Sequence, residues 1–373
     1  MNFLKQERAA LEALLPGLDA ALAQIPLLDM ERPGNPSIPK FRQLGGPALL
    51  IPARFSGRGA SPLQAVRVQR AIGCRAPSLA VATTMHHFTI ASLMEINPED
   101  PGLEGALLES VARDNLYVAS GFAEGRAGAS IQTSSLRMER GRNGLVLNGS
   151  KKPCSLSQSM DLFTVSTPAP EGMDAGLAAA IIPADTPGIV RRPFWTSPIL
   201  AGAESDEVVL RDVSVPEDAF LPLGGSGRSN AVQDRGFLWF ELLITASYLG
   251  IASALVERVL LSDRGGAAER VSLATEVEGA MTALEGIARG MIAGERGNEE
   301  LGRMLLVRYA VQDGIGRATT LAVELLGGMA FIQSPEVSYL LAASRALSLH
   351  PPSRPTTGKR LNEYLAGSPL VID

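Results

Sequence analysis

The stretch Arg142-Asn143-Gly144-Leu145-Val146-Leu147 lies near the middle of the chain, and the other segments are best interpreted from it. Asn-Gly is the preferred pair for a tight hairpin turn, because both residues tolerate positive φ. A β-type run, residues 131–138, precedes the pair, and a second one, residues 145–147, follows it. The pattern therefore predicts a β-hairpin at the centre of the chain.

Segments of two kinds surround the predicted hairpin. Further β-type runs at residues 162–166, 178–182 and 208–215 indicate a small β domain over residues 116–222. On either side, apolar residues recur three and four positions apart, which is typical of helices. Such stretches are residues 7–22 and 64–72 before the β domain, and residues 237–261, 273–294 and 300–326 after it. The sequence predicts an α+β chain with domains at 1–115, 116–222 and 223–373.

Composition excludes several function classes. The chain has 373 residues, is 46% hydrophobic, and carries 39 acidic against 34 basic residues with no Lys/Arg block, so we expect no nucleic-acid partner. Its two cysteines, Cys74 and Cys154, allow at most one disulfide, and no metal-ligand spacing occurs. An export pattern and an uninterrupted apolar run of membrane-spanning length are both absent, which predicts a cytoplasmic protein without membrane contact.

Four motifs follow one another in a fixed order. They are Ala123-Glu124-Gly125-Arg126-Ala127-Gly128-Ala129-Ser130, then Leu147-Asn148-Gly149-Ser150-Lys151-Lys152 with Ser155 after it, then Asp212-Val213-Ser214-Val215-Pro216-Glu217-Asp218, and Glu324-Leu325-Leu326-Gly327-Gly328. Each motif alone is more often a plain turn. As a collinear set they resemble the acyl-CoA dehydrogenase family.

The resemblance implies a fold and a cofactor. The fold is an N-terminal helical domain, a central small β-barrel-like domain and a C-terminal four-helix bundle around FAD. Phe122 and Ala123 would offer main-chain contacts to the flavin, Gly128 and Ala129 would lie at its diphosphate, and the Ser155 hydroxyl would reach N5. Glu324, Gly327 and Gly328 would meet the FAD of a neighbouring subunit, which implies a homodimer or homotetramer.

The chain also departs from the family at the flavin site. Pro153 stands where a tryptophan usually packs on the flavin. Arg264 keeps the basic residue of the segment that cradles the adenine, but the aromatic residue after it is lost. Glu324 replaces a glutamine, and an acid beside a diphosphate is repulsive unless it turns away or is paired.

The largest departure is at the catalytic position. In Ser344-Arg345-Ala346-Leu347-Ser348-Leu349-His350-Pro351-Pro352-Ser353, Pro351 aligns with the family's catalytic glutamate. Ser353 aligns with a threonine that faces the FAD diphosphate. Because proline cannot abstract a proton, either another residue is the base or the reaction is different.

Two residues are candidates for the missing catalytic group. Glu241 lies in the apolar run 237–243, where burial would raise its pKa, although it could equally be a salt-bridged acid. His350 adjoins the vacant position and could act as a base or a hydrogen-bond donor, or be a loop histidine bonded to backbone. Of the pair His86-His87, one could line an acyl pocket and the other face outward, or both could be structural.

Three functions remain open. The leading hypothesis is FAD-dependent oxidation of an acyl thioester carried by CoA or an acyl carrier protein, in a natural-product branch that lacks the usual glutamate. The second is a flavin monooxygenase of the same fold, with His350 close to the activated oxygen. The third is a non-catalytic relative.

Overall fold

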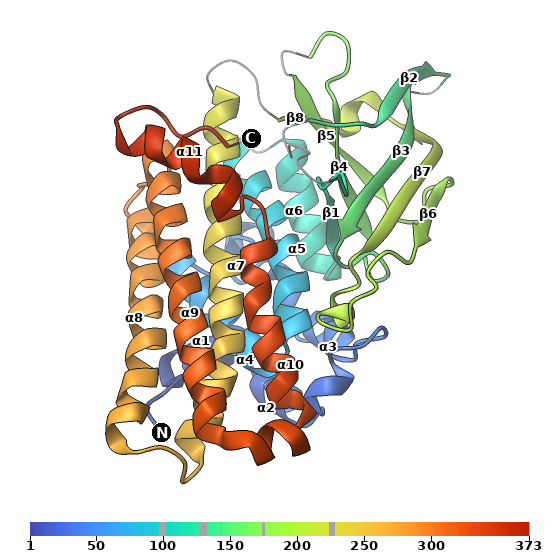
Figure 1. Ribbon diagram of the computed structural model, residues 1–373. Helices are drawn as coiled ribbons and strands as arrows, with labels where there is room; N and C mark the ends of the chain where they lie inside the picture. The colour runs from blue at the N-terminus through green and yellow to red at the C-terminus, as the bar shows by residue number, and fades with distance from the viewer. Residues whose placement is uncertain (97–101, 127–132, 143, 174–175, 224–227, 373) are drawn as a thin grey trace.

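The computed structural model describes residues 1–96, 102–126, 133–142, 144–173, 176–223 and 228–372. Figure 1 shows the β domain beside a bundle of long helices, with the shorter N-terminal helices behind the bundle. The predicted order of helices, small sheets and helical bundle is confirmed.

Six α-helices form the N-terminal part of the described chain. Their bounds are α1 Lys5–Leu14, α2 Leu18–Ala23, α3 Ser37–Gln43, α4 Pro62–Arg75, α5 Pro77–Ile96 and α6 Leu103–Asp114. The predicted helix at residues 7–22 is divided in two, because Pro16 follows α1 and Gly17 takes a φ of 81° before α2. Helix α4 begins at a capping box in which Ser61 and Gln64 satisfy each other's backbone N–H groups.

The β domain contains two four-stranded sheets within its described residues. One has the order β1-β4-β5-β8 and the other β2-β3-β7-β6. The strands are β1 Val118–Gly121, β2 Arg137–Gly141, β3 Gly144–Cys154, β4 Leu162–Pro168, β5 Leu177–Pro183, β6 Ile189–Arg192, β7 Asp206–Val215 and β8 Phe220–Leu223.

The predicted central hairpin is present as the antiparallel pair β2 and β3. Gly141 lies opposite Gly144 at the end of the pair, and Asn143, on which the predicted turn falls, lies outside the described residues. The expected first strand was placed too early. Residues 133–136 are irregular, and the strand begins at Arg137.

The C-terminal part is built on three long helices and one shorter one. Helices α7 Arg228–Leu261, α8 Ala267–Ile292, α9 Asn298–Gln333 and α10 Pro335–Ser344 pack on one another, and α11 Arg354–Leu365 follows a 3-10 turn, η6, at Arg345–Leu349. By length and composition alone α7 and α9 could cross a membrane, which is weak support for a span, and the apolar window of α7 is 94% buried inside the protein.

Helix α7 is the centre of the molecule because it packs on α4, α5 and α9. A Cβ at Gly73 would lie 2.3 Å from the Ser247 carbonyl oxygen, and a Cβ at Gly250 would lie 2.3 Å from the Arg70 carbonyl oxygen. The two glycines thus let α4 and α7 meet backbone to backbone. This contact fixes α7 against the N-terminal helices, and the side chains of its first half are placed beside the β domain.

Candidate active site

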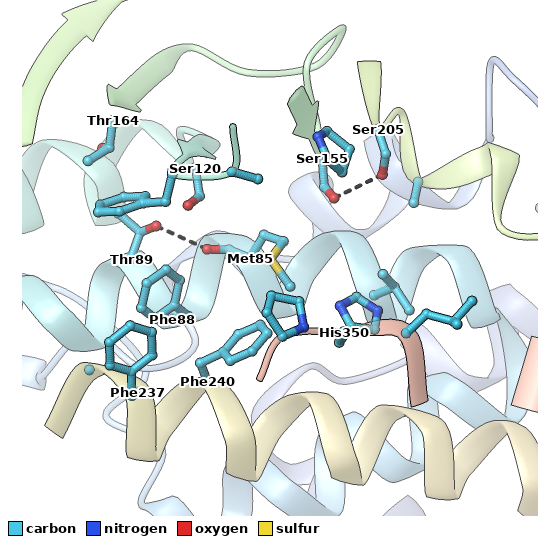
Figure 2. Close-up of a pocket in the computed structure, with 18 of the residues that line it drawn as sticks. Met85, Phe88, Thr89, Ser120, Ser155, Thr164, Ser205, Phe237, Phe240 and His350 are labelled. Atoms are coloured by element: carbon cyan, nitrogen blue, oxygen red, sulfur yellow. Dashed lines mark hydrogen bonds between the residues drawn. The ribbon is translucent and has the colours of Figure 1, made fainter. Parts of the chain in front are cut away.

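A cavity of about 900 Å³ lies where the β domain meets the helices. Its walls come from α5, α7, the β domain, the loop at residues 194–200 and the segment at residues 345–351. Figure 2 shows Ser155 and Ser205 on the β-domain side, with Phe237, Phe240 and His350 on the helical side. Segments far apart in sequence therefore form one site.

The β-domain wall carries the polar groups of the cavity. The hydroxyl oxygens of Ser155 and Ser205 are 3.0 Å apart and hydrogen-bonded. Thr164 on β4 is buried, and its hydroxyl has no hydrogen-bond partner among the described residues. Since buried hydroxyls are normally paired, the unpartnered Thr164 hydroxyl indicates that a polar ligand completes this wall.

Four of the predicted flavin contacts line this cavity together: Phe122, Ala123, Pro153 and Ser155. The carbonyl oxygen of Ala123 already accepts a hydrogen bond of 3.0 Å from the Lys152 N–H, which fixes the backbone at this point. The Lys152–Pro153 peptide bond is cis. Pro153 offers no aromatic ring, but Phe194 and Trp195 line the same cavity from a different loop.

The helical wall is mostly apolar. Phe88 on α5 lies edge-on to Phe240 on α7 with ring centroids 5.7 Å apart, and to Phe122 at 6.0 Å. Met85 and Phe237 extend the same wall, as Figure 2 shows. A surface of this kind binds hydrocarbon and excludes water from the polar groups opposite.

His350 is the titratable ring at the junction of the two walls. Its Nε2 is 2.8 Å from the Tyr248 hydroxyl on α7. Burial, with the nearby Arg308 guanidinium, lowers the pKa of His350 to about 3. The ring is therefore neutral at ordinary pH, and it is a weak base that can still donate or accept a hydrogen bond.

Glu241 does not line the cavity. Its side chain is fully buried, and Oε2 accepts a hydrogen bond of 2.6 Å from Arg308 Nη1 on α9. Burial raises the pKa of Glu241 to about 7, while Arg308 acts in the opposite direction. The structure thus supports the salt-bridged reading of Glu241, and proton abstraction in the cavity requires a group that reaches it.

The remaining predicted contacts lie elsewhere. Ser353 precedes α11, and its hydroxyl bonds Thr356 at 3.0 Å. Arg264 is exposed between α7 and α8, where the side chain of Leu325 packs against Gly265. Glu324, Gly327 and Gly328 lie on α9, and Glu324 lines a second groove of about 700 Å³. Gly128 and Ala129 lie outside the described residues.

The two neighbouring histidines are both part of the core. His86 Nδ1 accepts a hydrogen bond of 3.0 Å from the Val118 N–H, and its Nε2 lies 2.9 Å from the Pro47 carbonyl oxygen. Burial lowers the pKa of His86 to about 4 and that of His87 well below its usual value. Of the two alternatives left open, the structure agrees with the one in which both histidines are structural, because both are fully buried and neither lines the cavity.

Sequence reasoning missed Tyr248, Ser205 and Arg308. Tyr248 lies seven residues after Glu241 on α7, and this two-turn spacing puts both on one helix face. Arg308 interrupts the apolar run Leu305-Leu306-Val307, which is the same signal that singled out Glu241. Ser205 has no comparable signal, because only the fold brings it to Ser155.

The described residues that line the cavity include no aspartate and no glutamate. Among the described lining residues the titratable side chains are those of Arg345, His350 and Tyr248. Burial raises the pKa of Tyr248, so its phenol remains protonated. The site thus offers hydroxyls, a neutral imidazole and apolar surface, but no carboxylate base.

Comparisons with known proteins identify the family to which the chain belongs. No family model matches it. The chain is 45% identical over 380 residues, covering 100% of both chains, to isobutylamine N-hydroxylase of Streptomyces viridifaciens. It is 22% identical over 375 residues, 94% of this chain and 87% of the relative, to cyclohex-1-ene-1-carbonyl-CoA dehydrogenase of Syntrophus aciditrophicus. The solved FAD complex of PigA superposes with a TM-score of 0.78 at 16% identity, covering 98% of each chain.

The chain belongs to the acyl-CoA dehydrogenase-like flavoproteins, which confirms the resemblance and the fold expected from it. Its homologues are flavin-dependent oxidoreductases and monooxygenases. The hypothesis of a flavoprotein enzyme is therefore confirmed at this level.

Proposed function

We propose that this chain is a flavin-dependent monooxygenase that N-hydroxylates a small aliphatic primary amine. The observation that carries the proposal is the 45% identity to isobutylamine N-hydroxylase over the full length of both chains. The cavity supports it, because an apolar wall of phenylalanines lies opposite a wall of hydroxyls.

The residues of the cavity fit a flavin. The unpartnered Thr164 hydroxyl and the Ser155–Ser205 pair would supply hydrogen bonds to the polar atoms of the ring, and Phe122 and Ala123 line the same cavity. Bound here in its reduced form, FAD together with O₂ supplies one oxygen atom to the amine while the other leaves as water. The Arg264 and Glu324–Gly328 segments then remain for the FAD of a second subunit.

The cavity favours an amine in its neutral form. An alkyl ammonium has a pKa near 10, close to that of lysine, and desolvation disfavours the charged form. No acidic residue among the described lining residues offsets that desolvation. The amine nitrogen therefore keeps the lone pair that N–O bond formation requires.

His350 is the residue that we assign to the reacting atoms. As a neutral ring beside Tyr248, it can hydrogen-bond the substrate nitrogen or the oxygen being transferred. Its pKa of about 3 makes it a poor base for removing a proton from carbon.

The alternative function is oxidation of an acyl thioester on CoA or on a carrier protein, and the experiment must distinguish it from N-hydroxylation of an amine. Dehydrogenation between two carbons requires a base at the α-carbon, and Pro351 occupies the family's position for it. The Glu241 carboxylate is held by Arg308 outside the cavity lining. These two features favour oxygen transfer to nitrogen.

The test supplies purified protein with FAD, a separate flavin reductase, O₂ and isobutylamine, followed by mass spectrometry. We expect an amine product heavier by one oxygen atom, with the label incorporated from ¹⁸O₂. Short acyl-CoA and acyl-carrier-protein thioesters are offered in parallel. Formation of an unsaturated thioester, with the amines left intact, would overturn the proposal.

The variant His350→Gln tests the assigned residue. Removing one positioned hydrogen-bond group at the reacting atoms typically costs roughly 100- to 1,000-fold in rate, so we expect a fall of that order in hydroxylamine formation. The flavin content of the variant is the control, and it should equal that of the parent. Parent-level hydroxylation by His350→Gln would remove the ring from the mechanism.

A further inference from the structure

A buried arginine on α9 holds the backbone of the segment that carries His350. The Arg308 guanidinium donates hydrogen bonds to the carbonyl oxygens of Leu347 at 3.0 Å, His350 at 2.7 Å and Pro351 at 3.4 Å. Arg308 and this segment both come from the C-terminal part of the chain, although Arg308 and His350 are 42 residues apart in sequence. One planar, five-donor side chain thus defines the path of the backbone beside the cavity.

Glu241 in turn holds Arg308. Their side chains are both 0% exposed and joined at 2.6 Å. The other carboxylate oxygen, Glu241 Oε1, and Arg308 Nε have no partner among the described residues. Removing two charges from water costs free energy that an incompletely bonded pair does not fully recover. The pair is therefore poorly explained as a source of stability alone.

Helix α7 also contacts the histidine ring directly. Tyr248, which bonds His350 Nε2 at 2.8 Å, is seven residues beyond Glu241, on the same face of α7. The helix fixes the ring through Tyr248, and it fixes the backbone of the same residue through Glu241 and Arg308. Two points on one rigid helix are enough to set both the position and the orientation of the imidazole.

We propose that Arg308 and Glu241 are positioning residues that, together with Tyr248, hold His350 in its working geometry at the cavity. We call the contacts of Arg308, Glu241 and Tyr248 that hold His350 the clamp. The role in turnover rests on the function proposed above for His350, whereas the clamp itself is a statement about geometry. It gives Glu241 a role other than proton abstraction. It also explains why an acid and a base are buried as a pair behind a cavity wall whose described residues include no acid.

The first experiment measures the state of the His350 ring and not the enzyme activity. The chain has three histidines, and ¹⁵N-labelling of their rings in the FAD-loaded protein reports the hydrogen bonding and tautomer of each. The variants are Arg308→Lys, which keeps the charge but loses the planar fork, and Glu241→Gln, which keeps an acceptor but loses the charge. We expect both to shift the His350 resonances and to leave those of His86 and His87 in place.

The matched control is Arg67→Lys. Arg67 on α4 joins Glu285 on α8 at 2.7 Å, a cross-helix pair with no bond to the cavity segment. We expect it to leave all three rings unchanged. If Arg308→Lys and Glu241→Gln fold with parent-like His350 resonances, the clamp is refuted whatever reaction the protein catalyses.

A double-mutant cycle then connects the clamp to turnover. Combining Arg308→Lys with His350→Gln separates an effect exerted through the ring from an independent one. We expect Arg308→Lys alone to lower kcat about 10- to 100-fold, and to change it less than about 3-fold once His350 is absent. Equal losses in both backgrounds would show that Arg308 acts independently of His350. If the parent protein does not hydroxylate the amine but Arg308→Lys and Glu241→Gln still shift the His350 resonances, the proposed function is wrong and the clamp is supported.

Discussion

Ser155, which follows β3, and Ser205, which precedes β7, place two hydroxyls 3.0 Å apart at the cavity. We predict that Ser155→Ala will alter the visible spectrum of bound flavin and weaken flavin binding about 2- to 10-fold. This is the range of one net hydrogen bond of roughly 0.5–1.5 kcal/mol. Absorbance and equilibrium dialysis measure the two effects. An unchanged spectrum and affinity would remove Ser155 from the flavin site.

The pH dependence of turnover should come from the substrate and not from His350. Because the pKa of His350 is lowered to about 3, its ring stays neutral from pH 5 upward. The neutral fraction of the amine rises with pH toward its pKa near 10. We expect kcat/KM to increase across pH 6 to 9, and any inflection near pH 7 to come from the buried Glu241, whose pKa is raised to about 7, and to remain in His350→Gln. An inflection there that disappears in His350→Gln would contradict this prediction.

At the scale of a single element, helix α9 is interrupted by one residue with a non-helical backbone conformation. Gly327 has φ 83° and ψ 166° inside the helix, whereas Gly328 has no such φ, and a Cβ would meet open space at either residue. We predict that Gly327→Ala destabilises the fold by about 1 kcal/mol, from backbone strain alone. Gly328→Ala should be neutral or slightly stabilising.

Thermal unfolding of these two variants provides the measurement. A lower Tm for Gly327→Ala, with Gly328→Ala at or above the parent, is the expected order. Equal Tm values for both alanine variants would show that α9 straightens without cost. The break then would not be a fixed feature of the element.

At the scale of the whole molecule, the end of α9 points to self-association. Met329, Phe331 and Ile332 follow the break and are 59%, 45% and 75% exposed. Figure 1 places this end of α9 away from the β domain, near the loop between α7 and α8 that carries Arg264. Large exposed apolar side chains that cluster in this way are typical of subunit interfaces.

We predict that the parent protein is at least a homodimer and that Ile332→Glu shifts it toward the monomer. Light scattering after size exclusion measures the mass of each. Leu103→Glu on α6, where the side chain is 48% exposed, is the matched control and should keep the parent mass. A monomeric parent, or equal masses for all three proteins, would contradict the interface.

Much of this protein was determined by local sequence pattern. Alternation and an Asn-Gly turn define the hairpin of β2 and β3, and three- and four-residue spacing defines α7, α8 and α9. The absence of the usual base was visible at Pro351, and the resemblance singled out Ser155 and His350, which both line the cavity. These features depend on neighbouring residues or on the order of motifs along the chain.

Only the tertiary structure decided which of these side chains meet. Tyr248 and His350 are 102 residues apart, Glu241 and Arg308 are 67 apart, and Ser155 and Ser205 are 50 apart. The local sequence pattern of a buried acid in an apolar run is the same whether the acid faces the cavity or a guanidinium behind the cavity wall. The difference arises from the angle at which α9 packs on α7, which is set by side-chain packing between distant segments and by the desolvation that drives a buried charge to its partner.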